Sequence, residues 1–373
     1  MKQAPVLAPR RTGQISPASL FFPMAALFAA VAPAFWLLSW LGMITLPMSP
    51  DPLRHGHEML LGFASAVIAG FLVTKARPVL VWALAFLWLS ARLGGAGLLS
   101  PLGDAAAGVG FALLLFLLAG WPFLRAVRTG HNLFFAPILA LFCTAEILMR
   151  LGWSGLLPDL RPGHGLLLAL DAVTALLFVM GGRLIAGLAA SALRSQGLAA
   201  AHHRHLSAEW LGMAGIGLAA LARVLDMDGL VPWALAAAGL AVFYRLALWR
   251  SWRLFRAVLD LRLLLLAYLW LGLGLLLPLS GLFSSQTALH AITIGALGNA
   301  AAIMMPRTLL QRRRTTHPFP ALNGIAALLL SLSALARLTA PSWGSLVFLA
   351  AALLWSAAFL LLAVLLIRVL LEK

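Results

Sequence analysis

Long apolar stretches recur along the whole chain, separated by short breaks that contain proline, glycine or charged residues. Most stretches reach the length of about 20 residues that a helix needs to cross the hydrocarbon core of a bilayer. We find no short alternating segments of the kind that build a transmembrane barrel. The breaks place twelve expected spans at residues 18–42, 56–74, 79–99, 105–127, 132–151, 163–190, 207–224, 229–248, 262–281, 288–306, 319–339 and 343–370.

The composition agrees with a protein that lies mostly in lipid. Of the 373 residues, 62% are hydrophobic and only 10% are charged, whereas a soluble domain has about 25% charged residues. A bilayer requires each segment to satisfy its own backbone polar groups, which favours helices. The breaks leave no room for a soluble domain. We therefore expect an all-α, polytopic membrane protein that forms one transmembrane domain over residues 1–373.

The basic residues follow the expected topology. With the breaks numbered alternately, one side of the membrane carries 21 of the 27 Lys and Arg, including those of a short N-terminal tail at residues 1–17. The positive-inside rule assigns this side, and with it both termini, to the cytoplasm. The net charge of +16 then reflects topology, and we expect no nucleic-acid partner. The other side carries only Arg54, Arg92, Arg150, Arg161, Arg223 and Arg337.

Histidines from distant parts of the sequence are expected at one level of the membrane. His55 and His57 open the second span, His164 opens the sixth and His290 opens the tenth, all on the predicted periplasmic side. Neutral imidazole binds copper, iron and zinc. Since Cys143 is the single cysteine, a metal would be held by His, Met or carboxylate. Each of these histidines alone could simply be half solvated, but for the set we favour a metal site.

The spacing of His55 and His57 leaves two arrangements open. Residues two apart on a helix point about 200° away from each other. Either the helix begins at His57 and His55 bends round from the loop, or the two histidines serve different centres. Glu58 follows directly and could orient a ring N–H or donate a proton.

Small residues follow both His57 and His290. The segments "HEMLLGFASA" and "HAITIGALGNA" both run His, four residues, Gly. Such stripes allow close helix packing, or leave room for a flat macrocycle. The two segments belong to spans 2 and 10, which does not match a simple six-plus-six repeat.

Charged residues inside the spans are the other candidates for function. Asp171 lies seven residues past His164 on the same helical face and could carry protons inward. Glu146 precedes Arg150 by four residues, so we expect a helical ion pair there. Arg183 could pair with Asp171 or Glu146, bind an anionic group, or extend to the cytoplasm.

Four segments stand out in this order: "HGHEMLLGFASAVIAGFLVT", "HNLFFAPILALFCTAEILMRLG", "GGRLI" and "HAITIGALGNAAAIMMPRTLL". Together they resemble the NnrS family of bacterial membrane proteins. The sequence departs from the family where His131-Asn132 replaces Arg-Asn, where no proline follows Gly-Gly-Arg, and where "QRRRTTHPFP" replaces a Gly-His-Thr-Gly-Arg ending. These departures concern the inner side and leave the outer histidines intact.

The resemblance implies twelve helices, a haem that we expect to be b-type, copper, and a role in nitric oxide metabolism in the bacterial cytoplasmic (inner) membrane. A nitric oxide reductase-like reaction would take protons from Glu58 and Asp171 and electrons from an unknown donor. His57 and His290 are expected as haem-iron or copper ligands and His55 as a copper ligand. The candidate cofactor and metal ligands are His55, His57, His164, His290 and Arg183.

The alternative is a transporter, or a metal-handling or sensor protein without nitric oxide turnover. Twelve spans with intramembrane carboxylates suit a transporter as well. Transporters carry paired broken helices in corresponding halves, and the sequence shows no clear pair.

Overall fold

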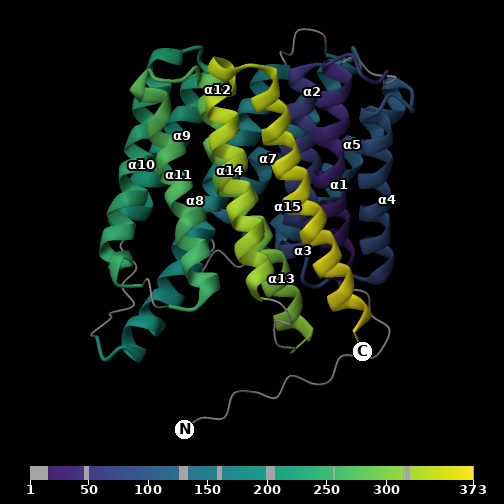
Figure 1. The fold of residues 1–373 in the computed structure, drawn as a ribbon. Helices are drawn as coiled ribbons and strands as arrows, with labels where there is room; N and C mark the ends of the chain where they lie inside the picture. The colour runs from purple at the N-terminus through teal and green to yellow at the C-terminus, as the bar shows by residue number, and fades with distance from the viewer. Residues whose placement is uncertain are drawn as a thin grey trace.

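The structure, a computed structural model, contains only helices and connecting turns in the part of the chain that it describes (Figure 1). Among the described residues, ten helices are long and apolar enough to cross a membrane. The expected all-α polytopic membrane protein is confirmed. Residues 1–15 of the expected N-terminal tail and His131 lie outside the described residues. The described residues are 16–45, 50–125, 133–157, 162–198, 206–254, 257–313, 315 and 320–372.

Each of the twelve expected spans contains a helical segment. Nine spans are single α-helices: α1 (Pro17–Trp40), α4 (Pro78–Gly95), α7 (Phe135–Trp153), α8 (Pro162–Ser195), α9 (Leu206–Val224), α10 (Val231–Leu248), α11 (Leu259–Ser280), α14 (Pro320–Trp343) and α15 (Ser345–Leu371). Short 3₁₀ turns, η3 (Asp228–Leu230) and η4 (Ser251–Arg253), lie on either side of α10.

The other three spans are interrupted by π-helical segments, in which the backbone takes one more residue per turn than usual. Span 2 consists of α2 (Pro52–His57), η1 (Glu58–Ala64) and α3 (Ser65–Leu72). Span 4 consists of α5 (Pro101–Leu115), η2 (Phe116–Gly120) and α6 (Trp121–Arg125). Span 10 consists of α12 (Ser285–His290), η5 (Ala291–Gly298) and α13 (Asn299–Arg313). Spans 2, 4 and 10 are thus irregular helices, although none of them is unwound.

The helices begin at ordinary sequence signals. The side chains of Ser16, Asp51, Ser100 and Ser284 each accept a hydrogen bond from a backbone N–H in the first turn of the helix that follows, at 3.1–3.2 Å. These N-caps satisfy donors that would otherwise lack partners. Proline follows the first three caps, where its fixed φ suits the first helical turn.

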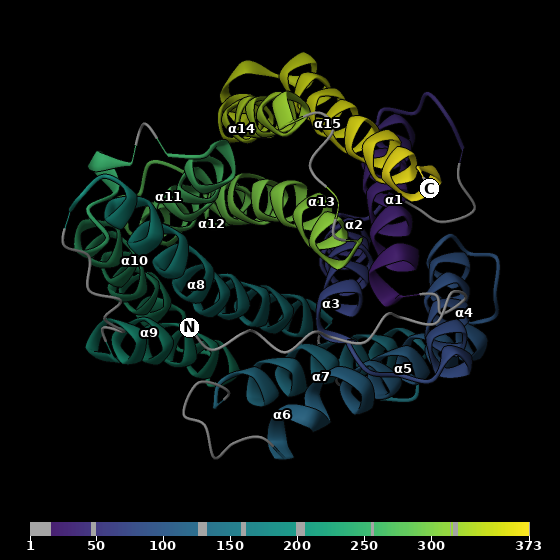
Figure 2. The ribbon, with the colours of Figure 1, turned by 90° about the horizontal axis from the view of Figure 1, so that it is seen from below.

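Spans 6 and 10 lie in the interior of the bundle together with span 2. The view along the bundle shows α8, α12, α13 and α3 surrounded by the other helices (Figure 2). Burial agrees, because 72% of the apolar window is buried in residues 285–313 and 61% in α8, against 39–56% elsewhere. Both η1 and η5 contact α8. All three interior spans begin near an expected outer histidine: His55 and His57 in span 2, His164 in span 6 and His290 in span 10.

Two arginines at the end of α13 link helices at the end of the bundle away from the outer histidines. Arg312 donates hydrogen bonds to the carbonyls of Gly70 and Phe71, at 3.2 and 3.1 Å. Arg313 donates to the carbonyls of Val369 and Glu372. Carbonyls at a helix C-terminus lack partners within the helix, and these guanidinium groups provide them. Helix α13 extends to Arg313, past the expected end of span 10 at residue 306. The hydrogen bonds of Arg312 and Arg313 bring the ends of α3, α13 and α15 to one level.

Candidate functional site

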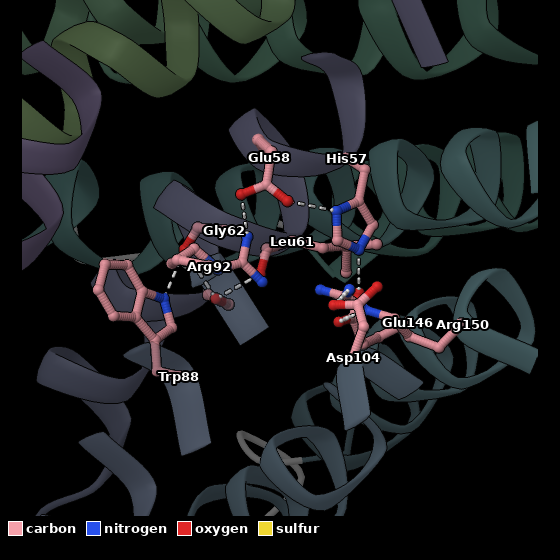
Figure 3. A network of polar contacts seen from close by, with 10 residues as sticks. His57, Glu58, Leu61, Gly62, Trp88, Arg92, Asp104, Glu146 and Arg150 are labelled. Atoms are coloured by element: carbon pink, nitrogen blue, oxygen red, sulfur yellow. Dashed lines mark hydrogen bonds and ion pairs between the residues drawn. The ribbon is translucent and has the colours of Figure 1, made fainter. Parts of the chain in front are cut away.

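His57 lies at the centre of a buried network of charged side chains (Figure 3). Its Nδ1 lies 3.0 Å from Oε1 of Glu58, and its Nε2 lies 2.6 Å from Oε2 of Glu146. An ionised carboxylate can only accept hydrogen bonds, and a neutral imidazole has a single N–H. For both contacts to be hydrogen bonds, the three groups must together carry one proton more than the neutral ring supplies.

Two arginines from neighbouring helices complete this network. Arg92 of α4 donates to Oε2 of Glu58 at 2.6 Å. Arg150 of α7 donates from Nε to Oε1 of Glu146 at 2.9 Å, and it also donates to Asp104 of α5. The ion pair that we expected between Glu146 and Arg150 is confirmed. The network joins spans 2, 3, 4 and 5, and we call it the His57 network.

Four glycines leave space for the His57 network. A Cβ on Gly62, Gly94, Gly95 or Gly108 would overlap the charged side chains of the network. Three of these glycines lie on helices other than the one that carries His57. The close approach of the ionic side chains to the helix backbones therefore depends on the absence of these methyl groups.

A cavity of about 150 Å³ lies on a different face of span 2. His55 of α2, His290 of α12 and Arg337 of α14 line it, and most of the remaining wall is apolar or aromatic. The ring of Trp36 lies 4.5 Å from the His55 ring, centre to centre. Two of the four expected outer histidines thus meet in one cavity, which we call the histidine cavity.

The His290 ring has a defined orientation. Its Nδ1 lies 2.9 Å from the carbonyl oxygen of Gln286, one helical turn earlier. Because a carbonyl can only accept, Nδ1 is the donor, and in the neutral ring the lone pair is then on Nε2. A backbone carbonyl that fixes the tautomer in this way is typical of metal-binding histidines.

His55 and His57 point to different places. His55 faces the histidine cavity between α1 and α14, whereas His57 faces α7. Of the two arrangements left open by the sequence, the structure shows a regular helix whose histidines serve different sites. Both ring nitrogens of His57 contact carboxylates, so a metal at this residue would have to displace Glu58 or Glu146.

His164 and Asp171 face the end of α9 and do not line the histidine cavity. Nε2 of His164 lies 3.7 Å from the Asp226 carboxylate, on the surface. Asp171 is buried and accepts hydrogen bonds from Arg223 Nη1 at 2.6 and 2.5 Å. The two residues do share a helical face, as expected from their spacing, but that face is turned toward α9.

Arg183 lies against an aromatic ring, with its guanidinium carbon 4.7 Å from the centre of the Phe135 ring. The carboxylates that we considered as its partners, those of Asp171 and Glu146, are bonded to other arginines. The preceding glycines of the "GGRLI" segment have another role. A Cβ on Gly181 or Gly182 would overlap Tyr268 or Arg245, so they admit these side chains against α8.

A second cavity of about 110 Å³ adjoins the first, and Leu297 lines both. It lies among α3, α8, α11, η5 and α13, and its wall is almost wholly apolar. Gly181 and Tyr268 form part of this wall. The second cavity thus lies between the three interior spans and α11, and it borders the histidine cavity at Leu297.

Sequence reasoning missed Arg92, Asp104 and Arg337, which lie on spans other than those that carry the histidines. One signal could have found the arginines. Both belong to the few basic residues on the side that the positive-inside rule leaves poor in charge. Six basic residues belong to this set. Four of them contact a carboxylate or an aromatic ring away from the histidine cavity: Arg54, Arg92, Arg150 and Arg223. Arg337 lines the histidine cavity, and Arg161 lies outside the described residues.

Within the described part of the chain, no three His, Cys, Asp or Glu side chains gather as metal ligands would. The histidine cavity offers two imidazoles, the thioether of Met59 and a guanidinium group. Two histidines in a largely apolar wall suit a haem iron better than a metal ion that needs several protein ligands, because the macrocycle supplies the remaining ligands.

The fold and site define a polytopic all-α membrane protein with two irregular interior helices, each of which carries a histidine into the bundle. The family model described as "NnrS protein" matches residues 19–373. The chain belongs to the NnrS family, and the resemblance found in the sequence is confirmed. No curated protein sequence and no solved structure matches the chain.

Proposed function

We propose that this protein binds haem in the histidine cavity, where His55 and His290 would hold the iron, and that nitric oxide binds the iron in place of one of these histidines. The observation that supports this most is that two histidines from spans 2 and 10 line one cavity with Arg337. The choice of nitric oxide as the ligand rests on the role in nitric oxide metabolism that membership of the NnrS family implies. We further propose the bacterial cytoplasmic membrane as the location.

The residues of the cavity fit a haem in their chemistry. The wall provides aromatic side chains such as Phe63 and Trp355 for a flat macrocycle. His290 keeps Nε2 available because Nδ1 is engaged by a carbonyl, and Trp36 restrains the ring of His55. A bound haem would supply an iron that can bind nitric oxide. The apolar wall would exclude water, and the adjoining apolar cavity would offer space for a small uncharged gas.

Reduction of nitric oxide would also need protons, since two molecules of nitric oxide, two electrons and two protons give nitrous oxide and water. Both candidate donors have a direct neighbour in the wall of the histidine cavity, Met59 beside Glu58 and Leu170 beside Asp171. Glu58 contacts His57 and is paired with Arg92. Asp171 is paired with Arg223, and its role in proton supply stays a prediction. An unknown electron donor would provide the electrons.

The test is an optical spectrum of the purified protein, reduced, with and without nitric oxide, with iron and copper quantified on the same sample. We expect haem bands that shift with nitric oxide and that are lost in His55→Ala or His290→Ala. His164→Ala is the matched control and should keep them. His57→Ala should also keep the bands but lower the melting temperature, because it removes the ring that contacts both buried carboxylates and leaves each with its arginine alone. A colourless, iron-free protein from haem-replete cells would contradict the proposal.

A second candidate function is copper handling. Met59 lines the cavity together with His55 and His290, and imidazole with thioether is a suitable donor set for copper. Under this alternative the same sample would contain copper without haem bands, and Met59→Leu would lower the copper content. Under the haem proposal, Met59→Leu leaves the iron content unchanged.

A further inference from the structure

The two histidine segments are equivalent in structure as well as in sequence. In span 2 an α-helix ends at His57 and a π-helical segment follows; in span 10 an α-helix ends at His290 and a π-helical segment follows. In both, the glycine five residues after the histidine has a carbonyl that accepts a side-chain hydrogen bond. The donor is Trp88 at 3.0 Å in the first segment and Asn299 at 2.8 Å in the second.

An arginine on the following helix accompanies each segment. Helix α4 follows span 2 and contacts η1, and α14 follows span 10 and contacts α12 and η5. Both helices carry the tripeptide Ala-Arg-Leu in their second half, with Arg92 in α4 and Arg337 in α14. Arg337 is therefore the counterpart of Arg92.

The two arginines differ in their partners. Arg92 donates to Glu58, the residue directly after His57, at 2.6 Å. The residue directly after His290 is Ala291, which offers no charge. Nη1 of Arg337 is shielded from solvent and has no hydrogen-bond partner among the described residues. The guanidinium carbon lies 4.7 Å from the centre of the Phe348 ring.

The cavity wall does not replace the missing carboxylate. Within the part of the chain that the structure describes, no Asp or Glu lines the cavity shared by His55, His290 and Arg337. A cation in apolar surroundings is costly without a counter-charge. A guanidinium group is suited to a planar carboxylate, which it binds through two parallel hydrogen bonds.

We propose that Arg337 binds a carboxylate of the ligand in the histidine cavity, in the place that Glu58 takes beside Arg92. The inference rests on the proposed haem site, and the carboxylate is then a haem propionate. Arg337 would thereby orient the macrocycle relative to His290. The histidine segment of span 10 can then hold a cofactor because it has Ala291 where the segment of span 2 has Glu58.

The test compares haem with haem dimethyl ester, in which both propionates are masked. Each is titrated into the full-length, haem-free protein in detergent, and the Soret band reports binding. We expect wild type to bind haem roughly 10- to 100-fold more tightly than the ester, the effect of losing a charged hydrogen bond. Arg337→Gln should weaken haem binding by about this factor and leave ester binding unchanged, and Arg337→Lys should fall in between.

The comparison in wild type needs no substitution, so it remains decisive if Arg337→Gln fails to fold. Equal binding of haem and ester by wild type, or unchanged haem binding by Arg337→Gln, would refute the role of Arg337 and leave the haem site intact. Loss of all haem binding in wild type, or haem binding that survives His55→Ala and His290→Ala, would refute the proposed function itself. A lipid phosphate is the other possible anion for Arg337. The propionate assignment is wrong if phosphatidylglycerol copurifies with wild type but not with Arg337→Gln while the two proteins bind haem with equal affinity.

Discussion

At the scale of single residues, the His57 network depends as much on glycines as on charges. Buried ion pairs compensate for their desolvation only when the geometry is close. The glycines bring charged side chains against the helix backbones, where a methyl group would separate them. The sequence could predict the contacts within one helix, such as Glu146 with Arg150, because helical spacing determines them. Helical spacing says nothing about contacts between helices, so it could not place Asp104 in the network, and Arg92 was marked only by the scarcity of basic residues on its side of the membrane.

Replacement of Gly108 tests this dependence. The methyl group of Gly108→Ala would meet Arg150 and Glu146, and we expect the free energy of unfolding to fall by about 1–3 kcal/mol. Gly187→Ala is the matched control, since Gly187 is also helical and a Cβ there meets no atom within 4 Å. We expect Gly187→Ala to be neutral or to stabilise the protein by up to about 1 kcal/mol. Unfolding in detergent measures both, and equal effects would contradict a special role for Gly108.

At the scale of helices, the irregular spans 2 and 10 are the informative elements. The sequence showed that both run His, four residues, Gly, but it did not show the π-helical segments. Over seven or eight residues the apolar pattern of an α-helix and that of a π-helix are too similar to separate, above all where almost every residue is apolar. Since π-helical segments are frequent at functional sites, their position directly after His57 and His290 supports a function for both.

The pairing of α8 with α9 gives a prediction for Asp171. Asp171→Asn leaves Arg223 without its counter-charge inside the bundle, so we expect the free energy of unfolding to fall by about 3 kcal/mol. Adding Arg223→Gln should restore part of this loss, because the unpaired charge is then removed. Chemical unfolding of the two variants in detergent measures the effect.

The same variants separate a structural role of Asp171 from proton supply. If Asp171 delivers protons, Asp171→Asn slows nitric oxide reduction while haem binding is kept, and the added Arg223→Gln does not restore the rate. A rate that recovers together with stability would contradict the proton role.

At the scale of the whole molecule, hydropathy predicted the order of the helical segments, one in each of the twelve expected spans, and ten helices of the described residues are long and apolar enough to cross a membrane. Where a segment enters and leaves the bilayer depends on its own composition, so most ends agree with the structure within a few residues. The packing of the spans could not be predicted, because helices in a membrane are apolar on most faces and have no stripe that marks the interior. The contact of α1 with α15, and the cavity between His55 and His290, are therefore known only from the structure.

Topology is the remaining prediction at this scale, and two cysteine variants test it. Met43 follows α1 and is 67% exposed, and Lys75 is exposed after α3, so the two residues flank span 2 at opposite ends. The native Cys143 is buried and should give little background. If both termini are cytoplasmic, a membrane-impermeant maleimide labels Met43→Cys in intact cells, whereas Lys75→Cys reacts only after permeabilisation. The reverse labelling pattern would contradict this topology. It would mean that the histidine cavity lies at the cytoplasmic face, where haem and electrons would reach it from the cytoplasm.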